Sequence, residues 1–252
     1  MSFFQSADAY DRFMGRYSTI LAPGFADLAG IEHGQRVVDV GCGPGELTAE
    51  LVKRVGADHV AAVDPSQPFV DAVRERYPGV DVQAGTAEQL PHPDGVFDAA
   101  VSQLVVHFMQ DAVAGVRDMA RVTRPGGVVA ACTWDLAGNR SPLAPFWMAV
   151  NQVDPNQRDE SERRGGSEED LAAIFAHAGL AGAATTELVV EAHHESFDEW
   201  WEPFELGVGP ASAYLTTLGP DKRDAIRERA QEFVPDEPHT IQWYAWAARA
   251  TV

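Results

Sequence analysis

The stretch of sequence that most constrains the fold is "RVVDVGCGPGELTAEL", residues 36–51. The β-branched run Val37–Val40 predicts a buried strand, and the apolar residues of 46–54 lie at helical spacing. A glycine-rich turn, 41–45, joins the two. A strand that feeds a helix through such a turn is the unit of open α/β sheets, whose ligands bind at the carboxyl ends of the strands. We therefore expect a ligand site at this turn.

Strand-like and helix-like segments alternate along the rest of the chain. The predicted strands are 37–40, 60–63, 80–84, 97–102, 128–133, 185–190 and 240–248, and the predicted helices are 46–54, 69–76, 111–123 and 170–178. This alternation predicts an α/β, Rossmann-like, doubly wound and mostly parallel seven-stranded sheet with helices on both faces. The polar segment 151–169 is expected to be a connection. The aromatic-rich insertion at about 195–236 is too long for a bare loop, so we expect it to form a small helical cap.

Composition and charge exclude several classes of protein. The formal charge of −19 argues against a nucleic-acid partner, because an acidic chain repels phosphates. The chain shows neither a run of apolar residues that could cross a bilayer nor a secretion signal, so no membrane insertion and a cytoplasmic location are expected. Cys42 and Cys132 form no disulfide or metal pattern, and His193 and His194 would point to opposite faces of a strand. No metal is expected.

The residues around the glycine turn select against a phosphate ligand. The dinucleotide fingerprint G-x-G-x-x-G has its third glycine where this chain has Glu46, and Asp39 adds a second negative charge. Asp64, about twenty residues past Gly43, ends the second predicted strand and is suited to accept hydrogen bonds from both hydroxyls of a ribose. The inferred ligand is adenosine-like and free of phosphates, and the carboxylates suit a positive charge.

Four ordered motifs resemble those of a known family. They are "VVDVGCGPG", "AVDPS", "AGTAEQLPHPDGVFDAAVSQLVVHF" and "RVTRPGGVV", and the resemblance, over about 10–133, is to class I S-adenosylmethionine-dependent methyltransferases of the ubiquinone/menaquinone-biosynthesis-like, type 11 branch. It implies a single methyltransferase domain, 1–252, in which helices of 1–30 close over the cofactor, 31–135 hold it, and 136–252 form the acceptor side. It also implies S-adenosylmethionine as cofactor and S-adenosylhomocysteine as product, with no metal. The implied acceptor is a small, partly apolar molecule methylated on O, N or C by in-line displacement.

The resemblance also assigns roles to individual residues. The backbone of 41–45 and the Asp39 carboxylate would hold the methionine moiety, and Asp64 would take the ribose. Ala87 and Glu88 would flank the adenine. The cofactor-binding residues expected on this basis are Arg16, Asp39, Gly41, Cys42, Gly43, Gly45, Asp64, Pro65, Ser66, Thr86, Ala87, Glu88 and Gln103.

One of these positions departs from the family pattern, and two others keep an alternative role. Thr86 stands where the family commonly has an aspartate that accepts a hydrogen bond from the adenine amino group, although a hydroxyl also accepts one. Gln103 either lines the methionine end of the cofactor or caps the next helix. Arg16 either pairs with the cofactor carboxylate or is an ordinary surface arginine.

No catalytic triad is expected, because methyl transfer from a sulfonium relies on holding the nucleophile and the methyl group in line. A general base is needed only if the acceptor must lose a proton, and His107 and His193 are the candidates, against a purely structural role for each. The segment "WWEPFELG", with Trp134 and Trp147, either walls the acceptor site or packs the cap. Two other functions stay open. One is an NAD-dependent oxidoreductase, which needs a pyrophosphate site, and the other is a non-catalytic S-adenosylmethionine-binding regulatory protein.

Overall fold

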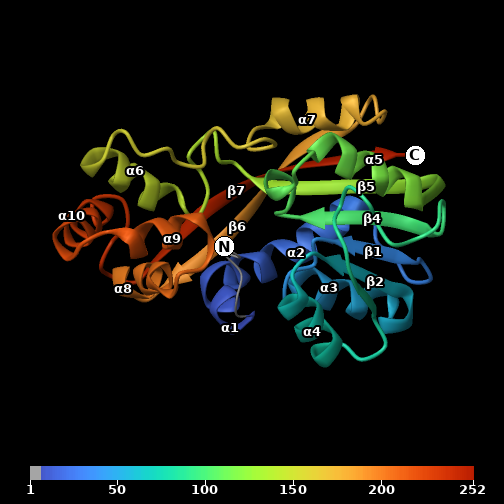
Figure 1. Cartoon of the computed structure of the whole chain (residues 1–252), viewed down its shortest axis with the longest axis horizontal. Helices are drawn as coiled ribbons and strands as arrows, with labels where there is room; N and C mark the ends of the chain where they lie inside the picture. The colour runs from blue at the N-terminus through green and yellow to red at the C-terminus, as the bar shows by residue number, and fades with distance from the viewer. Residues whose placement is uncertain (1–6) are drawn as a thin grey trace.

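The chain folds around one seven-stranded sheet (Figure 1), and this computed structural model describes residues 7–252. The strands are β1 (Val37–Val40), β2 (Val60–Asp64), β3 (Asp81–Ala84), β4 (Phe97–Gln103), β5 (Thr123–Trp134), β6 (Ala184–His194) and β7 (His239–Thr251). Their order is β3-β2-β1-β4-β5-β7-β6. β7 is antiparallel to both of its neighbours, and the other pairs are parallel. The mostly parallel α/β fold predicted from the sequence is confirmed.

Helices cover both faces of this sheet. The helices of the described residues, those of the cap included, are α1 (Ala7–Tyr10), the π-helix η1 (Asp11–Gly15), α2 (Arg16–Ala29), α3 (Glu46–Val55), η2 (Ala57–His59), α4 (Gln67–Arg76), η3 (Val106–Phe108), α5 (Ala112–Val122), α6 (Ala144–Val153), α7 (Glu168–His177), α8 (Phe197–Trp201), η4 (Glu202–Leu206), α9 (Gly209–Thr217) and α10 (Pro220–Ala230). Because strand side chains alternate between faces, Val37 packs with α2, α3 and α4, whereas Val38 packs with α5 and α7.

Several elements differ from the sequence prediction, and α6 and β5 are two of them. α6 was not predicted, because six of its ten residues are buried and the segment therefore has little of the polar face that marks an amphipathic helix. β5 begins at Thr123 and not at 128. The segment that was expected only to stop a helix is paired with the end of the chain beside β7, where Gly126 N–H donates to the Val252 carbonyl and Val252 N–H donates to the Gly127 carbonyl.

The N-terminal helices and the late insertion meet beside the sheet. α8, η4, α9 and α10 lie between β6 and β7, where the sequence predicted an insertion at about 195–236. η1 contacts η4, and the rings of Phe13 and Phe204 meet edge to face with centroids 5.2 Å apart. Of the predicted N-terminal segment 1–30, residues 1–6 lie outside the described part of the chain.

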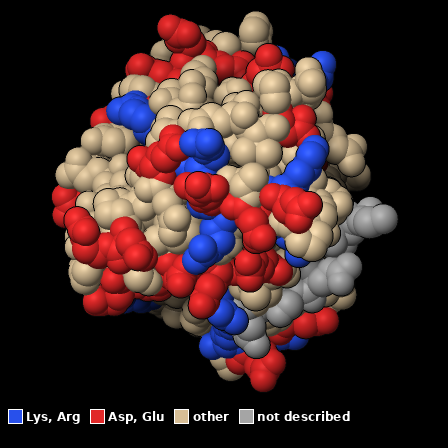
Figure 2. All heavy atoms as spheres, turned by 90° about the vertical axis from the view of Figure 1, so that its left-hand side faces the viewer, with Lys and Arg blue, Asp and Glu red and all other residues tan. Residues whose placement is uncertain are grey.

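One side of the molecule is distinctly acidic. Figure 2 shows the side that carries α6, α8 and α10, where Asp and Glu side chains spread over the surface and basic ones stand between them. Several of these basic residues are already paired: Arg227 with Asp198, and Lys222 with Asp154 at 3.2 Å. This arrangement gives the surface little capacity to attract a phosphate backbone.

Gly41 controls how β1 leaves the sheet. Its N–H donates to the Val63 carbonyl at 2.7 Å, and its φ of +77° lies in the left-handed region that favours glycine. A Cβ at this position would stand 2.5 Å from each γ-methyl group of Val105, in the segment that follows β4. Only a glycine therefore lets the β1 turn and the β4 turn approach so closely.

We predict that Gly41→Ala lowers the free energy of unfolding by about 1–2 kcal/mol for the left-handed backbone and by a further ~1–3 kcal/mol for the crowding against Val105. Gly34→Ala is the matched control, because Gly34 has a φ of +90° with nothing within 4 Å of an added Cβ. It should show the backbone cost alone. Denaturant unfolding of both variants measures the difference, and equal losses would contradict the crowding at Gly41.

Candidate functional site

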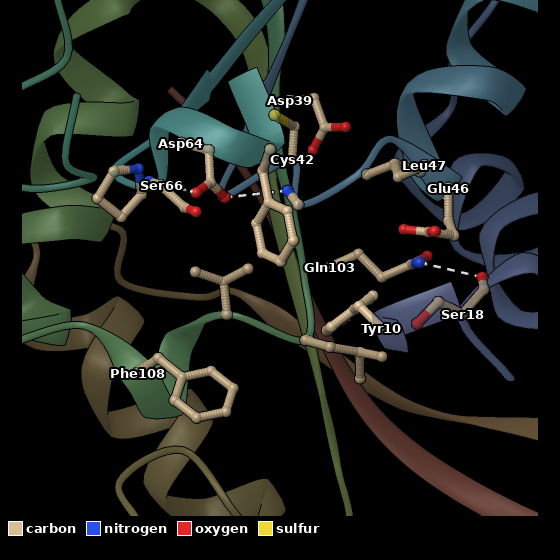
Figure 3. A pocket seen from close by; sticks show the side chains of 16 residues that line it. Tyr10, Ser18, Asp39, Cys42, Glu46, Leu47, Asp64, Ser66, Gln103 and Phe108 are labelled. Atoms are coloured by element: carbon tan, nitrogen blue, oxygen red, sulfur yellow. Dashed lines mark hydrogen bonds between the residues drawn. The ribbon is translucent and has the colours of Figure 1, made fainter. Parts of the chain in front are cut away.

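A cavity of about 350 Å³, here called the main cavity, opens at the carboxyl ends of β1, β2 and β4 (Figure 3). This is the point where the strand order reverses, which is where open α/β sheets bind ligands. Eight of the thirteen residues predicted to bind a cofactor line it: Asp39, Gly41, Cys42, Gly43, Asp64, Pro65, Ser66 and Gln103. Segments far apart in the sequence thus converge on one space.

Asp64 joins the turn after β1 to the turn after β2. Its Oδ2 accepts the Gly43 N–H at 2.9 Å and its Oδ1 accepts the Ser66 N–H at 2.8 Å. Burial raises the pKa of this carboxyl to about 6, although both hydrogen bonds act in the opposite direction. A carboxylate has about four lone-pair sites, so each oxygen keeps one for a ligand hydroxyl.

Two further carboxyls, Asp39 and Glu46, line the main cavity from β1 and α3. Asp39 is 1% exposed and accepts the Thr48 hydroxyl at 2.6 Å, and burial raises its pKa to about 7. Burial, reinforced by the nearby Asp11 carboxyl, raises the pKa of Glu46 to about 8. In Figure 3 the Asp64 and Glu46 side chains reach toward the same space from β2 and α3. Among the described residues that line this cavity, none is Lys or Arg.

A cleft of about 150 Å³, here called the side cleft, continues from the main cavity past Gly41 and Pro65, which line both. Its other walls include Thr86, Ala87 and Glu88, the three residues that the sequence associated with an adenine. Glu88 also accepts the N–H of Gln110 and of Asp111, so it ties this wall to the start of α5. The main cavity and the side cleft together form one elongated crevice.

Two residues that line the main cavity, Gln103 and Ser66, each have a buried polar atom without a hydrogen-bond partner in the described part of the chain. Gln103 donates from Nε2 to the Ser18 carbonyl at 3.1 Å, but its Oε1 is buried with no hydrogen-bond partner in the described part of the chain. The hydroxyl of Ser66 is in the same state. Because buried polar groups are normally satisfied, these two atoms indicate a polar ligand in this cavity.

The remaining two predicted residues, Arg16 and Gly45, do not line the main cavity or the side cleft. The Arg16 guanidinium is held by Glu199 of α8, through the carboxylate at 2.6 Å and the carbonyl at 3.0 Å. Gly45 begins α3 with a φ of +108° and lies on the far side of Glu46, in an outer pocket that Arg16 also lines. Arg16 therefore ties the N-terminal helices to the late insertion.

A smaller space, here called the apolar chamber, adjoins the main cavity and has a volume of about 40 Å³. It lies between the N-terminal segment and the region after β5, and its lining includes Phe13, Trp134, Leu136, His107 and Glu160. Burial lowers the pKa of His107 to about 3, with Arg163 adding to the shift, so its imidazole is neutral at neutral pH. The other candidate base, His193, is exposed at the outside of β6, where it bonds Thr240 and Glu195.

The sequence left two roles open for the tryptophans, lining an acceptor site or packing the cap, and their positions differ accordingly. Trp134 lines the apolar chamber. Trp200 and Trp201 lie in the core of the cap and donate to Pro142 and Glu205, and Trp147 donates from Nε1 to Glu160 Oε2 at 3.0 Å. Within residues 7–252, no group of three or more His, Cys, Asp or Glu side chains is placed to hold a metal ion.

Sequence reasoning missed three residues that line both the main cavity and the apolar chamber: Tyr10, Leu104 and Phe108. Leu104 directly follows β4 and has a φ of +62°, which is rare for a branched side chain and costs ~1–2 kcal/mol. The sequence carries no signal for this strain. The position of Leu104 beside the predicted Gln103 was the one available hint.

Comparisons with known proteins agree with this geometry. Residues 38–131 match the sequence profile of a family described as a methyltransferase domain. A malonyl-[acyl-carrier protein] O-methyltransferase of Serratia marcescens is 30% identical over 151 residues, which cover 58% of each chain. A demethylmenaquinone methyltransferase of Beutenbergia cavernae is 37% identical over 120 residues, which cover 48% of each chain.

A third relative is the 2-methyl-6-phytyl-1,4-hydroquinone methyltransferase 1 of rice, which is 37% identical over 119 residues. The match covers 46% of this chain and 34% of that one. The chain therefore spans 58%, 48% and 34% of the lengths of these three relatives.

Solved structures share the fold over nearly the whole chain. The YcgJ protein of Bacillus subtilis has a TM-score of 0.58 at 20% identity, covering 91% of this chain and 97% of that one. The [4+2]-cyclase SpnF has a TM-score of 0.55 at 21% identity, covering 93% and 81%. The family match of residues 38–131, the methyltransferase relatives and the shared fold together support a class I S-adenosylmethionine-dependent methyltransferase.

Proposed function

We propose that the protein transfers a methyl group from S-adenosylmethionine to a small-molecule acceptor. The observation that carries this proposal is the charge of the crevice: Asp39, Glu46 and Asp64 line it, and no described Lys or Arg does. Such a site repels a diphosphate and attracts a cation. S-adenosylmethionine is a nucleoside without phosphates that carries a sulfonium.

The residues of the crevice fit the parts of this cofactor. Asp64 is positioned to accept the two ribose hydroxyls, and the side cleft around Thr86 is placed to take the adenine. The methionine moiety would lie along the glycine turn, where a Cβ on Gly43 would meet nothing within 4 Å. The unpartnered Oε1 of Gln103 and the carboxyl of Asp39 face that end.

When bound, S-adenosylmethionine supplies an electrophilic methyl group on its sulfonium. The chain's own contribution is to orient that end of the cofactor with Asp39 and Gln103 and to exclude water with the apolar side chains of Leu47, Leu104 and Phe108. His107 would be an ineffective general base at neutral pH, because its conjugate acid has a pKa of about 3. Positioning, rather than proton transfer by a histidine, is therefore the main catalytic device in this proposal.

The acceptor in this proposal is small and at least partly apolar. Two relatives are named for methylating quinone-type compounds, and the space beside the main cavity is lined mainly by apolar side chains. The acidic surface supports the expectation that nucleic acid is not a substrate (Figure 2). Within the described residues no helix is long and apolar enough to span a bilayer. A cytoplasmic location stays a prediction from the free Cys42 and Cys132.

Calorimetric titration separates the proposal from its rivals. We expect S-adenosylmethionine and S-adenosylhomocysteine to bind and NAD not to bind, because a pyrophosphate would lie among the Asp39, Glu46 and Asp64 carboxyls with no described Lys or Arg of the cavity to balance its charge. Binding of NAD alone would instead support an oxidoreductase. Transfer of a labelled methyl group to reduced 1,4-hydroquinones then tests catalysis, and cofactor binding without transfer to any acceptor would favour a regulatory protein.

We predict that Asp64→Asn weakens the binding of S-adenosylmethionine by about 1.5–3 kcal/mol, because hydrogen bonds to a charged group are replaced by one neutral acceptor and one donor. Asp81→Asn is the control, since Asp81 is an exposed carboxylate at the start of the neighbouring β3. It should leave the affinity unchanged. Calorimetry on both variants decides, and equal affinities for wild type and Asp64→Asn would remove Asp64 from the site.

We also predict that S-adenosylmethionine binds more tightly as the pH rises from 5.5 to 7.5. Burial raises the pKa of Asp64 to about 6, of Asp39 to about 7 and of Glu46 to about 8, so the free protein holds protons on these carboxyls that a cation would displace. Each pKa that binding lowers by one unit strengthens affinity about tenfold above that pKa.

The neutral product separates this effect from others. S-adenosylhomocysteine lacks the sulfonium charge but shares the ribose and the amino-acid end, so the ratio of the two affinities should grow in favour of S-adenosylmethionine over this pH range. In the free protein the same groups have the opposite effect on folding, because stability that depends on their protonation is lost as the pH rises from about 4 through these raised pKa values. An affinity ratio independent of pH would contradict the role of the carboxyls.

A further inference from the structure

The apolar chamber adjoins the main cavity at the side of the cap. Tyr10, Leu104 and Phe108 line both spaces and therefore form the neck between them. Figure 3 shows Tyr10 and Phe108 flanking the main cavity on the side away from Asp39. A molecule that meets the cofactor from this side must pass or fill this neck.

The chamber offers no uncompensated charge among its described lining residues. Glu160 is its one carboxyl, and it is 4% exposed with both oxygens engaged: Oε1 with Arg163 Nε at 3.0 Å and Oε2 with Trp147 Nε1 at 3.0 Å. His107 is bonded through Nδ1 to the Thr133 hydroxyl at 3.1 Å and is neutral. A charged group entering the chamber would lose its hydration without finding a free counter-charge.

The size of the chamber is equally restrictive. Its volume is about 40 Å³, whereas an apolar cavity that admits benzene has a volume of about 150 Å³. Only a few heavy atoms fit beyond the neck as it stands. Among the described residues that line both the chamber and the main cavity, Leu104 is the aliphatic one, and the other two, Tyr10 and Phe108, carry rigid rings.

Leu104 is held in place at a conformational cost. Its φ of +62° is in the left-handed region, its N–H donates to the Cys132 carbonyl at 2.8 Å, and its side chain is 6% exposed. Strained residues of this kind persist where the surrounding structure fixes them, and they concentrate at binding and catalytic sites. The strained residue, Leu104, thus borders both the main cavity and the apolar chamber.

We propose that the apolar chamber receives the part of the acceptor next to the methylated atom, and that Leu104 is the specificity-determining residue that limits this part to a compact, uncharged, apolar group. This inference rests on the proposed function, since the methyl donor must occupy the main cavity. It adds the substrate class: an acceptor whose reacting atom carries a small apolar neighbour and no charge close by.

Crystals of the protein with S-adenosylhomocysteine, exposed either to xenon or to toluene, test the chamber directly. We expect xenon in the chamber of the wild type and no toluene there. Leu104→Ala should admit toluene, because it removes the wall at the neck. Leu104→Gly is the second variant, since it opens the same space and also relieves the left-handed backbone. The control is Asn139→Ala, because Asn139 is left-handed too, with a φ of +53°, but lies outside the chamber.

The outcomes separate this inference from the proposed function. Absence of S-adenosylhomocysteine from the main cavity would overturn both. Bound S-adenosylhomocysteine with xenon absent from the chamber, or with toluene excluded from both Leu104 variants, would overturn the chamber alone. Entry of toluene into Asn139→Ala would show that the chamber opens without any change at Leu104, and would likewise overturn the role of that residue.

An activity measurement tests the link to the acceptor. Methylhydroquinone and phenylhydroquinone, kept reduced and offered together with labelled S-adenosylmethionine, differ only in the bulk of their substituent. The wild type should favour the methyl compound, and Leu104→Ala should shift the ratio of kcat/KM values at least tenfold toward the phenyl compound. An unchanged ratio in an active Leu104→Ala variant would show that Leu104 does not select the acceptor.

Discussion

The site depends on one carboxylate that links two turns. Asp64 ends β2 and accepts backbone N–H groups from Gly43, after β1, and from Ser66, at the start of α4. These bonds fix the glycine turn relative to the neighbouring strand, so the floor of the main cavity is set before any ligand arrives. Because the same carboxylate is buried without a cation, it is held in a state that a ligand with hydroxyl donors would improve.

The sequence predicted the fold of residues 31–135 well because its signals are local. A strand, a glycine turn and a helix within 37–55 specify their own geometry, and Asp64 follows at the spacing that this unit requires. Thr86 and Gln103 were found through motifs that continue the same pattern, and the structure brings them to the crevice. Their contacts with a cofactor stay predictions.

Residues 136–252 and their contacts with the N-terminal helices were less predictable, because they depend on contacts between distant segments. α6 has little polar surface to indicate a helix, because six of its ten residues are buried. Arg16 was assigned to a cofactor carboxylate, yet its partner in the structure, Glu199, is supplied by a helix that no pattern near Arg16 reveals. The apolar chamber likewise combines η1 with the regions after β4 and β5, and the left-handed backbone of Leu104 arises only from that packing.

The fold by itself does not decide the reaction. A [4+2]-cyclase shares this architecture with a TM-score of 0.55, so a sheet of this order is compatible with different chemistry. What distinguishes one reaction from another must lie in the space next to the cofactor. In this protein that space has a neutral His107, a fully paired Glu160 and a strained Leu104 at its entrance. These side chains shape the space but supply neither a general acid nor a general base. They therefore suit a reaction, such as methyl transfer, that depends chiefly on the alignment of its reactants.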